Sequence, residues 1–139
     1  MEKPINIIDK TCQEMNSAIR FLARVYHSKV NSDESYRYQK TLNTAINADP
    51  TLVIKTVGPY LLKYGEPISN HEEKFFLEKD YSDDAKEEED AGKAMKAINA
   101  VKSVYLKCSK DERAKIMDTV SDMLSHYCEY QLAVKAATK

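Results

Sequence analysis

The stretch PINIIDKTCQEMNSAIRFLARVY, residues 4–26, decides the fold of this chain. Its apolar side chains recur at alternating steps of three and four residues, at Ile5, Ile8, Cys12, Met15, Ile19, Leu22 and Tyr26. That spacing keeps one apolar stripe on a helix, and Pro4 suits a first helical turn because its missing N–H would be unpaired there. The stretch predicts a long amphipathic helix that needs partners to cover its stripe.

Two later stretches repeat this pattern. The first carries Ala91, Ala94, Ile98, Val101, Tyr105 and Cys108, and the second carries Ile116, Val120, Met123, Tyr127, Tyr130 and Val134. Between them, Ser109 to Glu112 match a capping box, so the two helices should pack as an antiparallel pair or meet at a sharp corner. We predict an all-α fold, a bundle of five to six helices with three long amphipathic ones. Coiled-coil pairing between chains is an alternative, but three such helices can cover one another.

The length predicts a single α-helical domain over residues 1–139. Residues 1–49 should form a helical hairpin broken at Asn31, and residues 82–139 a long helical hairpin. Between them, residues 50–81 should hold short, aromatic-rich helices. Gly58-Pro59 should kink or restart the first of these, Gly65 should cap its end, residues 66–69 should form a loop, and Asn70 should start another short helix.

Composition narrows the class of protein. The chain has 3 glycines and 4 prolines, which suits long helices with short connections, and a net charge of −1, which gives no general attraction to nucleic acid. No apolar run is long enough to span a membrane, and the N-terminus lacks a signal-peptide core, so we expect a cytoplasmic protein. The 3 cysteines lack metal-like pairing and should be reduced thiols.

Residues 58–81, GPYLLKYGEPISNHEEKFFLEKDY, concentrate large aromatic side chains. These rings could plug one end of the bundle, which is the favoured interpretation, or stay exposed as a docking surface. The candidate partner-binding residues are Tyr60, Tyr64, Phe75, Phe76 and Tyr81, with Tyr36 and Arg37 as weaker candidates.

Part of this segment, GPYLLKYGEPISNHEEKFF, resembles a small uncharacterised protein of large nucleocytoplasmic DNA viruses. The resemblance rests on a hydrophobic-Lys-Tyr stretch, a loop, an acidic pair and Phe-Phe. No activity is assigned to that group, so the resemblance supplies no functional residue. It implies a viral product made in host cytoplasm, which could be packaged in the virion.

The sequence between residues 83 and 110 has an uneven charge pattern. An acidic run, DDAKEEED at 83–90, precedes Lys93, Lys96, Lys107 and Lys110, which fall opposite the apolar stripe. A solvated helix face that follows the macrodipole explains this best. The alternative is a phosphate-binding strip, which would make the protein a nucleic-acid-associated factor.

The sequence offers little that is typical of a catalytic site. It has no HExxH, GxSxG, P-loop or dinucleotide fingerprint. Zinc binding by Cys108, His126 and Cys128 would lack a CxxC pair and a clear fourth ligand. We therefore expect no enzyme and no cofactor, but a helical protein–protein interaction or structural module, such as a small adaptor or viral particle component. Its partner would be a protein, which could be a second copy.

Overall fold

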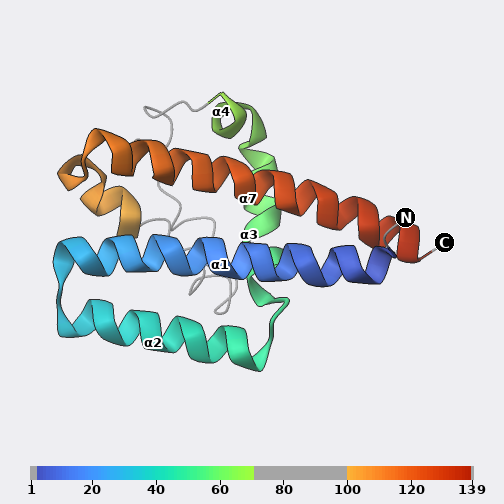
Figure 1. Ribbon diagram of the computed structural model, residues 1–139, viewed down its shortest axis with the longest axis horizontal. Coiled ribbons are helices and arrows are strands. Elements are labelled where there is room, and N and C mark those ends of the chain that lie inside the picture. Colours follow the sequence, from blue (N-terminus) through green and yellow to red (C-terminus); the bar gives the residue numbers. More distant parts are fainter. Residues whose placement is uncertain (1–2, 71–99, 139) are drawn as a thin grey trace.

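The computed structural model describes residues 3–70 and 100–138, and Figure 1 shows their arrangement. In chain order the elements are α1 (Pro4–Val30), α2 (Asp33–Ala48), α3 (Leu52–Lys63), α4 (Gly65–Ser69), the 3-10 turn η2 (Tyr105–Lys107) and α7 (Lys110–Ala137). Residues 100–104 are also helical. The predicted all-α bundle is confirmed. None of the described helices combines the length and apolar character needed to cross a bilayer.

The longest of the described helices, α1 and α7, form the centre of the fold. They run antiparallel, so both ends of the chain lie at the same end of the molecule (Figure 1). The stripe predicted on residues 4–26 is buried at Cys12, Met15, Ile19 and Leu22, and it meets a buried stripe of α7 at Ile116, Val120, Met123 and Tyr127. Beyond about residue 12 the stripe is thus covered from within the chain.

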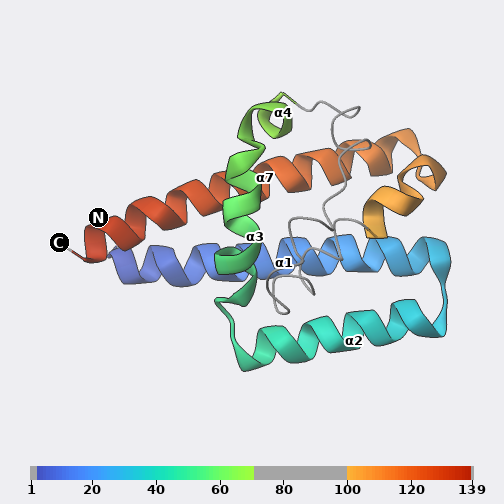
Figure 2. The same cartoon turned by 180° about the vertical axis from the view of Figure 1, so that it is seen from behind.

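The shorter helices complete two sides of this pair. Helix α2 returns along α1, and α3 crosses both α1 and α7 at a steep angle, as the opposite views in Figures 1 and 2 show. Buried Leu42 and Ile46 connect α2 to the core, and Val53, Ile54 and Val57 connect α3. Among the described elements, α7 has its most extensive contact with α1. The hairpin predicted for residues 82–139 stays a prediction, because residues 82–99 lie outside the described residues.

Local chemistry explains where the helices begin and end. Pro4 lies in the first turn of α1, and Asn31 ends that helix in the left-handed region at φ 47°, where asparagine is tolerated. Ser32 and Ser35 then form a capping box that starts α2. The capping box predicted at Ser109 and Glu112 is confirmed at the start of α7.

Several predictions for the middle of the chain are wrong. Residues 66–69 form a helix and not a loop, because α4 spans Gly65–Ser69 with Pro67 in its first turn and Ile68 buried. Gly65 does not cap α3, since Tyr64 takes that place and no described glycine has a positive φ. Helix α3 also continues through Pro59, so the restart expected there does not occur, while the alternative of a kink stays a prediction.

One of these differences has a simple cause. Lys55 and Pro59 are both exposed residues, so the helical hydrogen bond that Pro59 cannot donate is missing on the solvent side of α3 and not in the core. The long helix predicted through Cys108 ends instead in η2, which still buries Tyr105. The short helix expected from Asn70, and the helix start expected near residue 82, lie outside the described residues.

The contact between α3 and α7 is unusually close at Gly58. A Cβ atom built on Gly58 would lie 2.6 Å from Cγ of Tyr127 and even closer to two other atoms of that ring. Tyr127 is itself buried, so its ring has little room to move. Gly58 therefore sets the distance at which α3 can cross α7.

A polar contact joins the last turn of α1 to the first turn of α7. The Glu112 carboxylate accepts a hydrogen bond from Lys29 Nζ at 2.9 Å and one from the Ser109 backbone N–H at 2.8 Å. These bonds, led by the one from the Ser109 backbone, lower the pKa of Glu112 from 4.5 to about 2. The carboxylate thus both caps α7 and holds the last turn of α1.

We predict that Gly58→Ala destabilises the fold by about 1–3 kcal/mol, because the added methyl group overlaps the Tyr127 ring. The measurement is the free energy of unfolding in urea. Gly65→Ala is the matched control, because a Cβ there would lie 3.7 Å from Leu124 Cδ2, an ordinary contact. Equal stability of the two variants would contradict this account of the crossing.

We predict a pH-dependent effect of Glu112→Gln. A lowered pKa in the folded state means that the carboxylate stabilises the fold above pH 4.5, and that this contribution is lost as the pH falls toward about 2. The variant should therefore have a lower Tm than the parent protein at pH 7, and the gap should close on acidification. A gap that is unchanged at about pH 2 would show that the charge is not responsible.

Candidate functional site

The turn between α1 and α2 fixes which residues of the two helices face each other across a polar groove. The Asn31 backbone N–H donates to the His27 carbonyl at 2.7 Å, and the chain then reverses into α2. Two side-chain contacts hold the returning helix, His27 Nδ1 to Ser35 Oγ at 2.6 Å and Arg20 Nε to Asn43 Oδ1 at 2.8 Å. Residues 20–24 of α1 are thereby held opposite residues 36–43 of α2.

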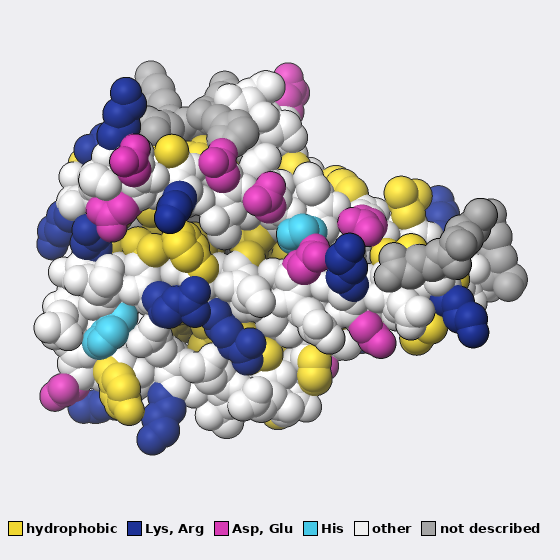
Figure 3. All heavy atoms as spheres, viewed as in Figure 1, with side chains coloured by type: hydrophobic (Ala, Val, Ile, Leu, Met, Phe, Trp, Pro, Cys, Tyr) yellow, Lys and Arg dark blue, Asp and Glu magenta, His cyan; other side chains and the backbone are white. Residues whose placement is uncertain are grey.

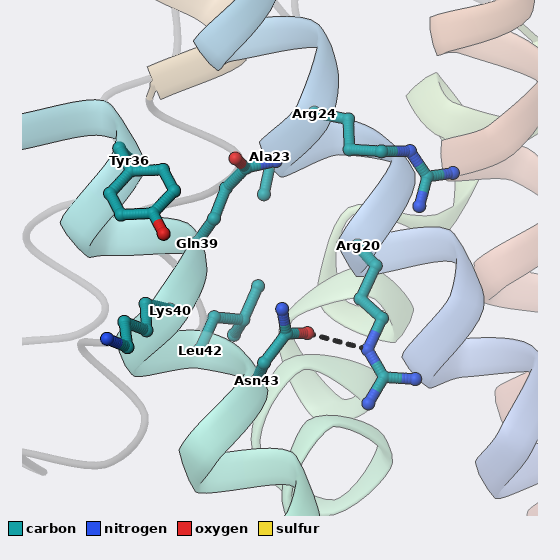
Figure 4. Close-up of a pocket in the computed structure, with 8 residues that line it drawn as sticks. All are labelled: Arg20, Ala23, Arg24, Tyr36, Gln39, Lys40, Leu42 and Asn43. Carbon is teal, nitrogen blue, oxygen red and sulfur yellow. Dashed lines mark hydrogen bonds between the residues drawn. The ribbon is translucent and has the colours of Figure 1, made fainter. Parts of the chain in front are cut away.

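A groove of about 270 Å³ lies between these segments. Its apolar lining comes from Ala23 and Leu42, which are 1% and 2% exposed. Polar side chains from both helices surround them, and Figure 4 shows all eight lining residues: Arg20, Ala23, Arg24, Tyr36, Gln39, Lys40, Leu42 and Asn43. The site is therefore an apolar strip with a polar rim.

The charge of the groove is positive. Arg20, Arg24 and Lys40 line it, and no aspartate or glutamate does. Within residues 3–70 and 100–138, the ion pairs seen are Lys29 with Glu112 and His126 with Glu14, and neither involves the groove. In the space-filling view of Figure 3, Lys and Arg side chains gather on the surface over α1 and α2. The groove thus offers cations without counter-charges from the described part of the chain.

The two arginines are held in different ways. Arg20 and Arg24 are four residues apart on α1, a spacing at which like charges cost a helix about 0.2–0.5 kcal/mol. Arg20 is fixed through its Nε by Asn43, while the Arg24 side chain makes no hydrogen bond to another described residue. Figure 4 shows that the cationic groups of Arg24 and Lys40 spread outward instead of meeting. Such a rim suits several anionic groups in a row better than one small anion.

Tyr36 stands at the edge of this groove. Its side chain is 58% exposed, and its ring lies 6.3 Å from that of His27, centroid to centroid. Arg37, the next residue, is exposed as well. The two weaker partner-binding candidates of the sequence thus lie at or beside the groove, where an aromatic ring and a cation could contact a partner.

The other candidates that the structure describes do not line the groove. Tyr60 and Tyr64 are partly buried and pack against the core on α3 and at its end, and Lys63 Nζ lies 5.2 Å above the Tyr64 ring. Lys107 and Lys110 are exposed at the corner between η2 and α7. Phe75, Phe76, Tyr81, Lys93 and Lys96 lie outside the described residues.

Sequence reasoning missed Arg20, Arg24 and Lys40. Each looks like an ordinary solvent-facing charge when its own helix is read alone. One signal was available, since Arg20 and Arg24 share a face and the positions four residues before and after them are Asn16 and Ser28, not acids. A helix that only needed solubility would pair such charges with glutamates.

The residues weighed for zinc occupy separate environments. His126 Nδ1 lies 2.7 Å from Glu14, Cys128 is exposed, and Cys108 is buried with Sγ 3.6 Å from the Val104 carbonyl. Among the described residues, no three His, Cys, Asp or Glu side chains come together as a metal site would require. Burial raises the pKa of the Cys108 thiol, and also that of Cys12. Both thiols are thereby kept protonated and shielded.

We predict that one of the 3 cysteines reacts quickly with dithionitrobenzoate in the native protein. That thiol is Cys128, because Cys12 and Cys108 are 4% and 3% exposed and a protonated, buried thiol is a poor nucleophile. All three should react in denaturant. Cys128→Ser should remove the fast phase, and a fast phase that survives this change would show that a buried thiol is accessible.

Comparison with protein-family models, with curated proteins and with solved structures finds no match to this chain. The viral relationship suggested by residues 58–76 stays a prediction. The geometry of the α1–α2 groove is therefore the basis for assigning a function.

Proposed function

We propose that this protein is a helical protein-interaction module that docks an acidic segment of a partner protein in the α1–α2 groove. One observation carries the proposal. Arg20, Arg24 and Lys40 surround an apolar strip with no carboxylate of the described chain to neutralise them. The cost of holding two arginines four residues apart on one helix is explained if a partner supplies the missing negative charge.

The side chains that line the groove favour binding over catalysis. Its polar groups are guanidinium, ammonium, phenol and amide groups, which orient and hold a ligand. The described lining contains no serine, cysteine, histidine, aspartate or glutamate, the side chains that most often act as nucleophile or general base. A partner segment that alternates acidic and apolar side chains would place its acids on the rim and its apolar groups over Ala23 and Leu42.

Tyr36 and Arg37 extend this contact surface. Tyrosine and arginine are frequent anchors of protein interfaces, because each combines a large contact area with hydrogen-bonding groups. Tyr36 is exposed and flanks the groove, so its ring can pack on a partner without any change in the fold. We therefore place these two residues in the interface and keep the aromatic residues of 58–81 as a secondary candidate surface.

Nucleic acid fits this site less well. A nucleic-acid groove needs cations that follow a charged backbone, whereas these cations occupy a compact site between two helices. The net charge of −1 gives no general attraction to a polyanion. A module of this kind suits a small adaptor or a minor component of a viral particle, and the sequence resemblance implies the second of these settings.

The test uses a fluorescein-labelled peptide of alternating glutamate and leucine, with glutamine in place of glutamate as the neutral reference. Fluorescence anisotropy should detect binding of the acidic peptide only, and the affinity should fall with added salt. Arg24→Glu should weaken binding at least about tenfold, which corresponds to about 1.4 kcal/mol. Circular dichroism checks that the helices are retained.

Lys115→Glu is the matched control, because it makes the same change in net charge at an exposed position of α7, away from the groove. It should leave the affinity unchanged. Equal weakening by both variants would mean that overall charge, and not the groove, binds the peptide. Salt-sensitive binding of a labelled DNA duplex, with no binding of the peptide, would favour the nucleic-acid alternative.

A further inference from the structure

A row of side-chain amides runs along α2 beside the groove. Gln39 and Asn43 line the groove, and Asn47 continues the row one turn further along α2. Successive members are four residues apart, which separates them by about 6 Å along the helix axis. Figure 4 shows the Gln39 and Asn43 side chains reaching from α2 toward α1, beside the apolar strip of Ala23 and Leu42. The amides therefore recur at a fixed step along the groove.

Most of the hydrogen-bonding capacity of this row is unused within the described chain. Arg20 Nε lies 2.8 Å from Asn43 Oδ1, and because an arginine N–H can only donate, the Asn43 amide must turn its oxygen toward Arg20. The Asn43 NH₂ group is then directed away from Arg20 and remains a donor. The side chains of Gln39 and Asn47 make no hydrogen bond to another described residue. The row thus offers three donors, with acceptors at Gln39 and Asn47.

An extended polypeptide has the matching repeat. Each residue of a strand directs its N–H and C=O toward the same edge, and residues that share an edge are two apart in sequence, or about 6.6–6.8 Å along the strand. One side-chain amide can accept from the N–H and donate to the C=O of such a residue. An α-helical ligand offers no such groups along its length, because its N–H and C=O groups bond to one another. The spacing of the amides therefore favours an extended main chain.

We infer that the acidic partner segment lies in the α1–α2 groove in an extended conformation, with its main chain hydrogen-bonded to the Gln39 and Asn43 amides. This inference rests on the proposed function and adds to it the conformation of the ligand. Side chains of an extended segment alternate between two faces. The apolar ones cover Ala23 and Leu42, while the acidic ones project out of the groove, where Figure 4 shows the cationic groups of the rim spreading outward.

The first test compares two fluorescein-labelled peptides that contain the same numbers of glutamates and leucines. One alternates the two residues, and the other orders them so that the leucines lie on one face of a helix and the glutamates on the opposite face. Fluorescence anisotropy should show at least about tenfold tighter binding of the alternating peptide, because only its main chain can bond to the amides.

The outcomes of this comparison separate the two proposals. Equal or tighter binding of the helical order overturns the extended conformation, while docking of an acidic segment stands. Binding of neither peptide overturns both the docking and the conformation.

Backbone N-methylation tests the main-chain contact directly. Methylating either every leucine N–H or every glutamate N–H of the alternating peptide blocks one edge of an extended chain and leaves the other edge intact. One of the two methylated peptides should lose about tenfold or more in affinity, and the other should bind as the unmodified peptide does. Equal affinities of the two methylated peptides overturn the inference.

Gln39→Met assigns the sensitive edge to the amide row. The variant keeps the length of the side chain but removes its amide, so it should bind the alternating peptide about three- to tenfold more weakly. The sensitive methylated peptide should lose less relative to the unmodified one in this variant than in the parent protein. Parent-like binding by Gln39→Met overturns the inference, and circular dichroism checks that its helices are retained.

Two further variants complete the design. Gln131→Met makes the same change at an exposed position of α7, away from the groove, and should leave the affinity unchanged. Arg24→Glu removes a cation of the rim and should weaken the methylated and unmodified acidic peptides by the same factor. Loss of the charged contact and loss of the amide contact therefore give different patterns of binding.

Discussion

The structure depends on the packing of α1 against α7. Each helix has one apolar stripe, and Met15, Ile19, Ile116 and Met123 are fully buried where the stripes meet. Short helices are marginally stable alone, so α3 and α4 depend on this pair for a surface to pack on. Helix α2 depends on it too, because its buried side chains contact a helix whose position α7 has already fixed. Glu112 strengthens the same pairing at one end by holding both Lys29 and the first turn of α7.

Much of this fold can be predicted from local sequence patterns, and part of it cannot. The stripe of residues 4–26 and the capping box at Ser109 predict α1 and α7 because helix periodicity and capping act within a few residues. Residues 66–69 resist prediction, since Glu-Pro-Ile-Ser has loop chemistry and becomes a helix only where Ile68 finds a buried site. The groove could be predicted in part. Tyr36 and Arg37 stood out as interface types, whereas Arg20 and Lys40 belong to one site only because the turn at Asn31 returns α2 along α1 in one register.

The proposed binding groove and the open end of α7, beyond Tyr127, differ in chemistry and in place. The α1–α2 groove is cationic with a narrow apolar strip, while the open end of α7 is mainly apolar with one acid and one base beside it. They share no residue, and the α1–α7 core lies between them.

The contact between Gly58 and the Tyr127 ring also limits how this sequence can diverge. A side chain at position 58 is compatible with the fold only if position 127 becomes smaller, so the two positions are free to change together and not separately. Tyr127 also accepts a hydrogen bond from Gln131, which extends the dependence into the open face of α7. Distant descendants of this chain should therefore show paired substitutions at 58 and 127, and such covariation would be a more durable mark of the fold than any single residue in it.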